Sequence, residues 1–262
     1  MMKKLVLISL ICVVSAVTMP VSADLISDAD SAYVNDQFDR AVELYNRAVD
    51  SLGGSSERYY NLGNAYFRSG HPGMAIVSYE RALRLDPTDS DVRDNLEFVN
   101  SRITDRIDAG DSFINNSVDS IAVSLHPDTW GVIALVTFLL MLAGVLVYFM
   151  ASGIMLRKVG FFGAGILLIV TVVANFLAYR AAGNVTATDR AVIIQPSVIL
   201  STTPRQPKDR SEEAFLLHEG TKVHILDSIS DPSDRTGKIK WYDVRVDNSH
   251  RAWISSESVE II

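Results

Sequence analysis

The sequence predicts a multidomain protein with three kinds of structure: an all-α region of helical repeats, a two-helix transmembrane hairpin and a small C-terminal all-β barrel. Three observations predict this fold class. Residues of the same type recur at a fixed spacing in the N-terminal third. Two later runs of about 21 apolar residues carry no charge. Short β-branched and aromatic segments, separated by proline and glycine, follow residue 187.

Charge is distributed unevenly along the 262 residues, whose formal net charge is −7. Residues 24–128 contain nine arginines, no lysine and 19 acidic residues, whereas residues 187–262 contain 10 basic and 12 acidic residues. Binding to a phosphate backbone needs the opposite sign of charge. We therefore expect no nucleic-acid partner.

The N-terminus has the pattern of a secretory signal peptide. Two lysines precede the apolar run Leu5–Val17, and Val21–Ala23 ends in small residues. We expect a signal peptide over residues 1–23, cleaved after Ala23. An uncleaved anchor is the alternative, although about 13 apolar residues fall short of the roughly 20 that span a bilayer. Cys12, the single cysteine, leaves a lipoprotein as a further alternative.

The repeats are clearest in the second copy. Its signature residues are Tyr59, Leu62, Gly63, Tyr66, Ala75, Tyr79, Ala82 and Pro87. They fall at the positions of the tetratricopeptide pattern, whose repeat length is about 34 residues and in which small residues let two helices approach. One repeat length before Ala75, Tyr79 and Ala82 stand Ala41, Tyr45 and Ala48. Residues 24–109 thus resemble two tetratricopeptide repeats with a capping helix that begins near Ser90.

This resemblance implies a protein-binding groove lined by the first helix of each repeat. By position, the groove residues are Ile26, Asp30, Tyr33, Tyr60, Asn64, Phe67 and Arg68. Asn64 matches the asparagine of the subclass that clamps a carboxylate, whereas Tyr60 stands where that subclass has lysine. The alternative is that Tyr60 and Phe67 pack against the capping helix.

The two apolar runs predict transmembrane helices at residues 129–150 and 159–180, after a juxtamembrane segment at 110–128. The loop 151–158 carries Arg157 and Lys158, which the positive-inside rule assigns to the cytoplasm. Both flanking regions then lie on the other side, where the signal peptide also sends them. The apolar runs themselves, 130–150 and 159–179, contain no Asp, Glu, Lys, Arg or His, and Arg180 follows the second run directly. We therefore expect an anchor in the lipid bilayer rather than a channel.

The C-terminal region predicts a small barrel. The expected strands are 191–194, 198–200, 222–226, 241–246 and 251–254. Residues 187–262 resemble the bacterial SH3 domain family, with Ala252 where members usually have glycine. That family binds peptides or peptidoglycan, so the resemblance implies a ligand face at Trp241 and Tyr242; core positions for both are the alternative.

Signals of catalysis are absent from the sequence. The five histidines are scattered, and no paired metal spacing or glycine-rich phosphate loop occurs. We expect no enzyme activity, no metal site and no cofactor.

The order of these parts resembles the BatE family of the Bacteroides aerotolerance (Bat) operon group. The resemblance implies a scaffold that acts beside von Willebrand A-domain membrane proteins and a MoxR-type ATPase in stress tolerance. It also implies an inner-membrane location with both soluble domains in the periplasm. The alternative is a peptidoglycan- or peptide-binding anchor that acts through the SH3-like domain.

Overall fold

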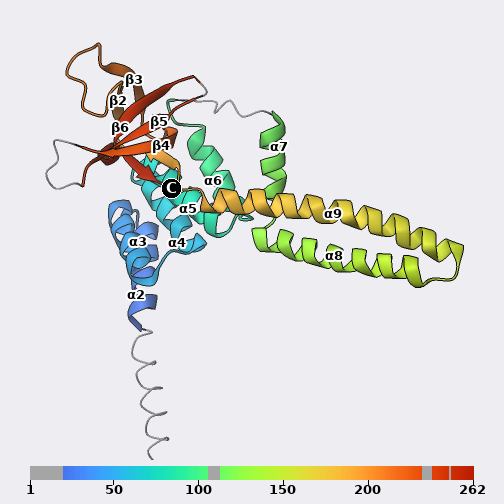
Figure 1. Cartoon of the computed structure of the whole chain (residues 1–262). Helices are drawn as coiled ribbons and strands as arrows, with labels where there is room; N and C mark the ends of the chain where they lie inside the picture. Colours follow the sequence, from blue (N-terminus) through green and yellow to red (C-terminus); the bar gives the residue numbers. More distant parts are fainter. Residues whose placement is uncertain (1–19, 106–112, 232–237, 248) are drawn as a thin grey trace, which may run out of the picture. The chain divides into compact units, whose positions relative to one another are not determined.

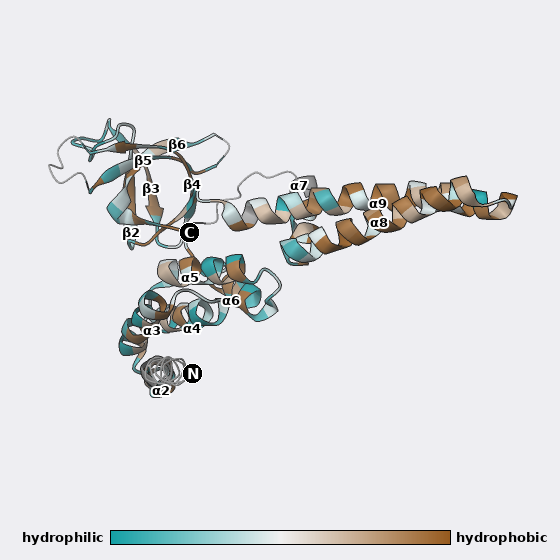
Figure 2. Ribbon diagram, turned by 60° about the horizontal axis from the view of Figure 1, so that its bottom comes forward, coloured by the Kyte–Doolittle hydropathy of each residue, from teal (hydrophilic) through white to brown (hydrophobic). Residues whose placement is uncertain are grey.

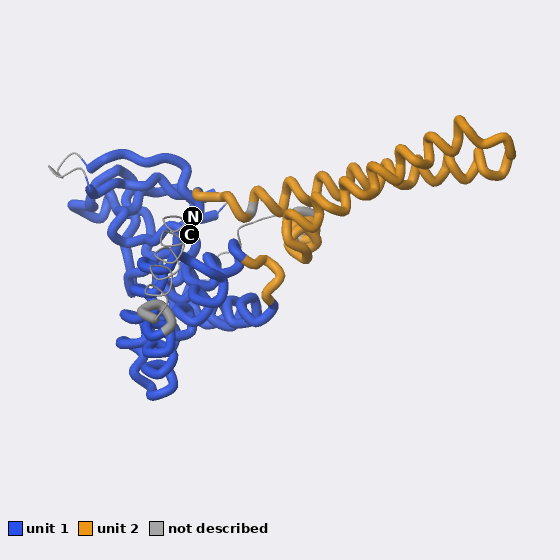
Figure 3. Tube along the Cα trace, turned by 90° about the horizontal axis from the view of Figure 1, so that it is seen from below, with its two compact units in different colours: residues 1–85, 90–109, 189–262 blue, residues 86–89, 110–188 orange. Residues whose placement is uncertain are grey.

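The computed structural model describes residues 20–105, 113–231, 238–247 and 249–262. The chain forms two compact units, of which the first contains residues 1–85, 90–109 and 189–262, and the second residues 86–89 and 110–188 (Figure 3). Most of the expected signal peptide, residues 1–19, lies outside the described residues. The expected cleavage position after Ala23 falls inside the first described helix, and cleavage stays a prediction.

The helices of the first unit form antiparallel pairs along the chain (Figure 1). They are α2 (Pro20–Val34), α3 (Phe38–Leu52), α4 (Ser56–Arg68), α5 (Pro72–Leu85) and α6 (Ser90–Asn100). Local chemistry sets their ends. The Ser55 hydroxyl accepts a hydrogen bond from the backbone N–H of Arg58 at the start of α4. Gly53 and Gly70 take positive φ angles of 81° and 86° in the turns after α3 and α4.

Close packing of α4 on α5 explains the repeat signature. A Cβ atom on Gly63 would lie 2.6 Å from the ring of Tyr79, so only glycine fits there. Leu62, Ala75 and Ala82 are buried beside this contact. The signature residues therefore hold the helices together, as the pattern predicts.

The β-strands form one seven-stranded sheet in the order β3-β2-β6-β5-β4-β1-β7, and its pairings are antiparallel. The strands are β1 (Arg190–Ile193), β2 (Ser197–Ser201), β3 (Glu213–His218), β4 (Lys222–Ser230), β5 (Lys240–Arg245), β6 (Arg251–Ser255) and β7 (Val259–Ile261). A short 3₁₀ helix, η1 (Ser256–Ser258), joins the last two. The five predicted strands are confirmed, while β3 and β7 went unpredicted. Closure into a barrel and membership of the SH3 family stay predictions.

Within the first unit, α5 contacts the sheet through a dense set of polar and apolar groups. Val192 and Ile262 are buried in the same apolar cluster as Ile76 and Val77 of α5. Gly220 has a φ of 89°, and a Cβ atom there would lie 2.5 Å from the Ile103 side chain. The repeats and the sheet thus share one apolar cluster of the core.

Ion pairs and hydrogen bonds surround that shared core. Arg81 pairs with Glu260 at 2.5 Å, and Lys222 pairs with Glu80. The carboxylate of Asp105 accepts hydrogen bonds from the His218 backbone N–H at 2.6 Å and the Thr221 hydroxyl at 2.9 Å. These contacts join segments that are far apart in the sequence.

The second unit contains α7 (Phe113–Ala122), α8 (Pro127–Met150) and α9 (Ile154–Thr186). Two segments, Pro127–Met150 and Ile154–Gly183, are long and apolar enough to cross a membrane. Figure 2 shows that hydrophobic residues dominate this hairpin. Arg180 near the end of α9 pairs with Asp119 of α7 at 2.8 Å, and the Trp130 indole N–H donates to the Ala122 carbonyl. Aromatic and charged groups thus cluster at one end of the apolar segments.

The connection between α8 and α9 is shorter than the sequence predicts. The predicted loop covers residues 151–158, but α9 begins at Ile154, so Arg157 and Lys158 lie in its first turns. Both residues have high helix propensity, and Gly153 is the N-cap. The positive charges therefore remain at the turn of the hairpin, on a helix instead of a loop.

Candidate functional site

Two predicted groove residues have the same structural role in successive repeats. The hydroxyl of Tyr45 donates a 2.5 Å hydrogen bond to Asp30, and the hydroxyl of Tyr79 donates a 2.7 Å hydrogen bond to Asn64. Both members of the second pair lie one repeat length after those of the first. Burial and the hydrogen bond to Asp30 raise the pKa of Tyr45, so its hydroxyl remains a donor. This bond ties the first helix of each repeat to the second.

The capping helix α6 contacts the next part of the predicted groove. The Asn95 side-chain amide donates to the Tyr60 hydroxyl at 3.2 Å and to Asn64 Oδ1 at 3.0 Å. Asn64 Oδ1 thus accepts two internal hydrogen bonds. Tyr60 therefore contacts the capping helix, as the alternative to ligand binding predicts. Ligand binding by Tyr60 and Asn64 stays a prediction.

Aromatic rings and guanidinium groups alternate near the C-terminal ends of the first helices of the repeats. The rings of Phe67 and Phe98 meet edge to face at 5.6 Å, and Tyr33 and Phe38 meet in the same way at 5.6 Å. The Arg102 guanidinium lies 4.1 Å from the centre of the Phe98 ring, and that of Arg68 lies 4.3 Å from the centre of the Phe38 ring. We call these six residues the aromatic–arginine strip. Phe98 belongs to α6 and Arg102 to the turn after it, and neither is among the predicted groove residues.

Exposure differs among the predicted groove residues. Arg68 is exposed and also pairs with Asp36 at 3.2 Å. Ile26, Tyr33 and Phe67 are half-buried, and Asp30 is exposed. The structure brings Tyr33, Phe67 and Arg68 into the strip and leaves Ile26 on α2 without a described role.

The predicted ligand face of the sheet divides between two sides of β5. Adjacent residues of a strand point to opposite faces. Tyr242 packs into the apolar core of the sheet with Val244. Trp241 points the other way, is only 5% exposed, and its indole N–H donates to Asp231 at 2.9 Å. The two aromatic residues therefore form no common face, because the strand pleat separates them.

Trp241 nevertheless contributes to a cleft of about 390 Å³ in the sheet. Residues of β2, β3, β5 and β6 contribute to this cleft, and β2 pairs with β6 at Ser201 and Trp253. Its lining residues are Gln195, Ser197, Val198, Ile199, Gln206, Pro207, Leu216, Trp241, Ser255, Glu257 and Ser258. Glu257 is the charged residue in that set. The lining thus combines apolar side chains, neutral polar groups and one carboxylate.

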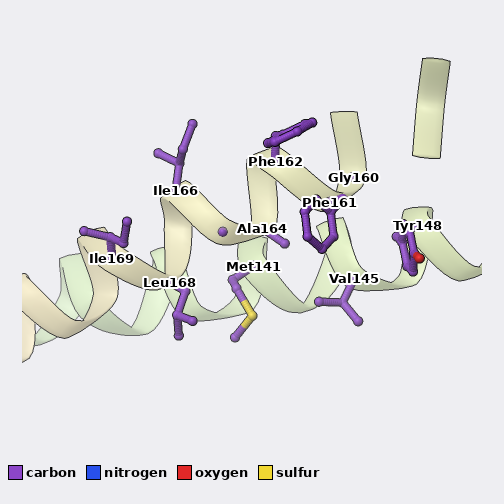
Figure 4. A pocket seen from close by; sticks show the side chains of 11 residues that line it. Met141, Val145, Tyr148, Gly160, Phe161, Phe162, Ala164, Ile166, Leu168 and Ile169 are labelled. Carbon is purple, nitrogen blue, oxygen red and sulfur yellow. The ribbon is translucent and has the colours of Figure 1, made fainter. Parts of the chain in front are cut away.

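A second hollow, of about 410 Å³, lies on the hairpin and is almost wholly apolar (Figure 4). Met141, Val145 and Phe161 line it, with Ala164 and Gly160 at its base where the helices meet. A Cβ atom on Gly160 would lie 2.7 Å from the Gly144 carbonyl, so these small residues serve packing within the hairpin. The hollow suits hydrocarbon and has no chemistry of its own.

Metal sites are not indicated in the part of the chain that the structure describes, where no group of three or more His, Cys, Asp or Glu converges. His218 is 3.0 Å from Asp105 in the contact between the repeats and the sheet. His224 lies 3.9 Å from Asp189. The two histidines that share a region in sequence therefore have separate carboxylate neighbours.

A family model described as "Tetratricopeptide repeat" matches residues 56–89. These residues span α4, α5 and the turn that leads to α6. This segment is a tetratricopeptide repeat. The match covers the copy in which the sequence signature is complete, and such repeats are non-catalytic modules for protein interaction.

The chain is also similar to a "Protein SGT1 homolog" from Oryza sativa subsp. japonica, with 33% identity over 67 residues. That stretch is 26% of this chain and 18% of the relative. The chain therefore matches under a fifth of the relative's length. The similarity supports the tetratricopeptide region and does not extend to the function of the whole relative.

Proposed function

We propose that the chain is a membrane-anchored scaffold whose tetratricopeptide region binds proteins. The observation that carries this proposal is the repeat at residues 56–89, with a side-chain core that leaves aromatic and arginine groups exposed. The two apolar helices supply the anchor. The role is one of binding, because tetratricopeptide repeats serve as modules for protein interaction.

A single orientation suits this scaffold. The repeats and the sheet contact each other through residues such as Asp105 and Thr221, so both must lie on one side of a bilayer whose apolar core is about 30 Å thick. The two apolar helices that separate the repeats from the sheet in the chain meet that requirement if each crosses the bilayer once. We place both soluble parts in the periplasm because Arg157 and Lys158 sit at the hairpin turn.

Cysteine labelling tests the orientation. Single cysteines at Glu43, Arg210 and Arg157, in a Cys12→Ser background, are treated with a membrane-impermeant maleimide on intact spheroplasts. The first two are expected to react at once and the third only after permeabilisation. Labelling of Arg157→Cys alone in intact spheroplasts would reverse the orientation, and labelling of only one soluble part would contradict the hairpin.

The finer assignment, a complex with von Willebrand A-domain membrane proteins and a MoxR-type ATPase, rests on domain order. Its test is affinity purification from solubilised membranes with Gly63→Leu, since a side chain there would collide with the Tyr79 ring. Arg47→Ala, an exposed change on α3, is the control. Partners that co-purify in stoichiometric amount should be recovered with the control variant and should not be recovered with Gly63→Leu. Partners retained by Gly63→Leu would refute binding through the repeats.

A second candidate function is a peptide- or peptidoglycan-binding anchor, which the cleft between β2 and β6 favours. Ile199 and Leu216 line it although 46% and 50% exposed. The detergent-solubilised full chain should sediment with purified sacculi, less so with Ile199→Asp and normally with Leu226→Asp, an equally exposed residue outside the cleft. No sedimentation above a control protein would remove this candidate.

A further inference from the structure

The aromatic–arginine strip is unusual for the surface on which it lies. In the described helices of the first unit, three large hydrophobic side chains are exposed: Val34, Leu85 and Phe98. Val34 lies one repeat length before Arg68, at the equivalent position of the first repeat. Phe98 lies one repeat length after Asn64. Val34 therefore falls in the same row of the repeat as Arg68, and Phe98 is itself part of the strip.

The two guanidinium groups recur with the repeat. Arg68 is the last residue of α4, and Arg102, one repeat length later, follows α6 within two residues. A cation near a helix C-terminus stabilises the helix dipole by about 0.3–1 kcal/mol, which is the simplest explanation for both. Yet each guanidinium lies over a phenylalanine ring, at 4.1–4.3 Å. The rings hold each cation beside exposed apolar surface.

Existing partners leave these cations able to bind an anion. Arg68 pairs with Asp36, but the two side chains are 49% and 76% exposed. Exposed pairs contribute only about 0–1 kcal/mol, so an incoming carboxylate can replace Asp36. Arg102 is exposed, and its guanidinium lies 4.1 Å from the centre of the Phe98 ring. A guanidinium beside a ring retains N–H groups that can donate hydrogen bonds.

We propose that the strip recognises a peptide segment of a protein partner that presents an apolar side chain next to a carboxylate. The apolar side chain packs on the exposed ring of Phe98, and the carboxylate accepts hydrogen bonds from the Arg102 guanidinium, which lies over that ring. This inference rests on the proposed function, because it names the chemistry of the partner that the repeats bind.

The acidic surroundings sharpen this selectivity. Residues 24–128 carry 19 acidic groups against nine arginines, so an acidic segment is repelled over most of the region. At physiological ionic strength the Debye length is about 8 Å, so the repulsion of distant charges is screened while a contact with a guanidinium is not. A carboxylate therefore binds at the strip and is disfavoured elsewhere.

Synthetic peptides test the proposal directly. The detergent-solubilised full chain is applied to arrayed nonapeptides of glycine and serine that carry leucine, phenylalanine or serine at the centre and glutamate, lysine or serine beside it. Peptides with both an apolar centre and glutamate should bind best. Arg102→Glu should turn the preference from glutamate to lysine, and Phe98→Ser should abolish the advantage of leucine and phenylalanine.

Arg47→Glu is the matched control, since it makes the same charge change on exposed α3, away from the strip. It should leave the peptide ranking unchanged. Arg102→Gln should weaken binding of the glutamate peptides about tenfold, as expected for one charge-assisted hydrogen bond. Circular dichroism checks that each variant keeps its helices.

Equal binding of glutamate and lysine peptides, or a preference that Arg102→Glu leaves unchanged, would overturn the inference. Such a result, with partners still lost in Gly63→Leu, would leave protein binding by the repeats standing. Absence of peptide selectivity, together with partners that Gly63→Leu retains, would reject the two proposals together.

Discussion

Some residues of the repeats make internal contacts that stabilise the fold, whereas others are exposed and can contact a ligand. Asp30 and Asn64 stand at groove positions in the sequence, yet each accepts a hydrogen bond from a tyrosine in the following helix. A ligand at these positions competes with an internal bond. Within the described part of the chain, Phe98 and Arg102 accept no such hydrogen bond from a tyrosine, and both side chains are exposed. Selectivity is therefore expected at the strip.

Replacing Tyr79 with phenylalanine tests the internal role. Tyr79 is 1% exposed and its hydroxyl donates to Asn64. Loss of that bond should lower the free energy of unfolding by about 1 kcal/mol, measured by urea denaturation followed by helical circular dichroism. Tyr33→Phe is the control, because its hydroxyl has no hydrogen bond among the described residues. Equal stability of the two variants would show that the hydrogen bond between Tyr79 and Asn64 does not stabilise the fold.

The elements that the sequence predicted best are those with strong periodic signals. The repeat period placed α3, α4 and α5, and charge-free runs placed α8 and α9. Strand β3 was missed because Glu213–His218 mixes charged and apolar residues without clear alternation. Strand β7 is very short, Val259–Ile261, and shows no pattern. The division of Trp241 and Tyr242 between two faces follows from their adjacency in one strand and was predictable.

Contacts between segments that are distant in the chain could not be predicted from patterns in the sequence. Asp105 has no feature in the sequence that points to Thr221, which belongs to the sheet region. The aromatic–arginine strip also joins neighbouring helices, although the spacing of Arg68 and Arg102 matches the repeat period. Extending the period through α6 would have revealed that row.

The packing of α8 on α9 predicts that alanine substitutions at two glycines of α9 have different effects on stability. A Cβ atom on Gly160 would lie 2.7 Å from the Gly144 carbonyl, whereas Gly163 has nothing within 4 Å. Gly160→Ala should destabilise the hairpin by about 1–3 kcal/mol through overpacking. Gly163→Ala should be neutral or slightly stabilising, since alanine favours a helix. Reversible unfolding in detergent measures both, and equal effects would contradict the helix contact.

At the scale of the molecule, the contact between the repeats and the sheet depends on the charge of Asp105. Burial raises the pKa of this carboxyl, but hydrogen bonds from the His218 backbone and side chain and from Thr221 outweigh it and leave the pKa below its usual value. The charged form thus stabilises the folded state. That contribution is complete above the unfolded pKa of about 3.9 and is lost as pH falls through the lower folded pKa.

Thermal unfolding at several pH values tests this dependence. Asp105→Asn should lower the Tm at pH 7, and the difference from wild type should shrink as pH falls below about 4. Asp94→Asn, which removes the same charge from an exposed position on α6, should have little effect throughout. A Tm difference for Asp105→Asn that stays constant into acid would show that its charge is irrelevant to the contact.

The shared core of α5 and the sheet also sets an order of events during biosynthesis. Roughly 100 residues separate α5 from β1, and they take about 5–20 s to synthesise. During that interval the apolar surface around Ile76 lacks the Val192 and Ile262 side chains that later cover it. In the membrane topology proposed above, residues 190–262 reach the side of the repeats only when both spans of the hairpin are inserted. In the proposed topology, burial of Ile76 then depends on correct membrane insertion, and a chain that inserts wrongly leaves this apolar surface without its Val192 and Ile262 neighbours.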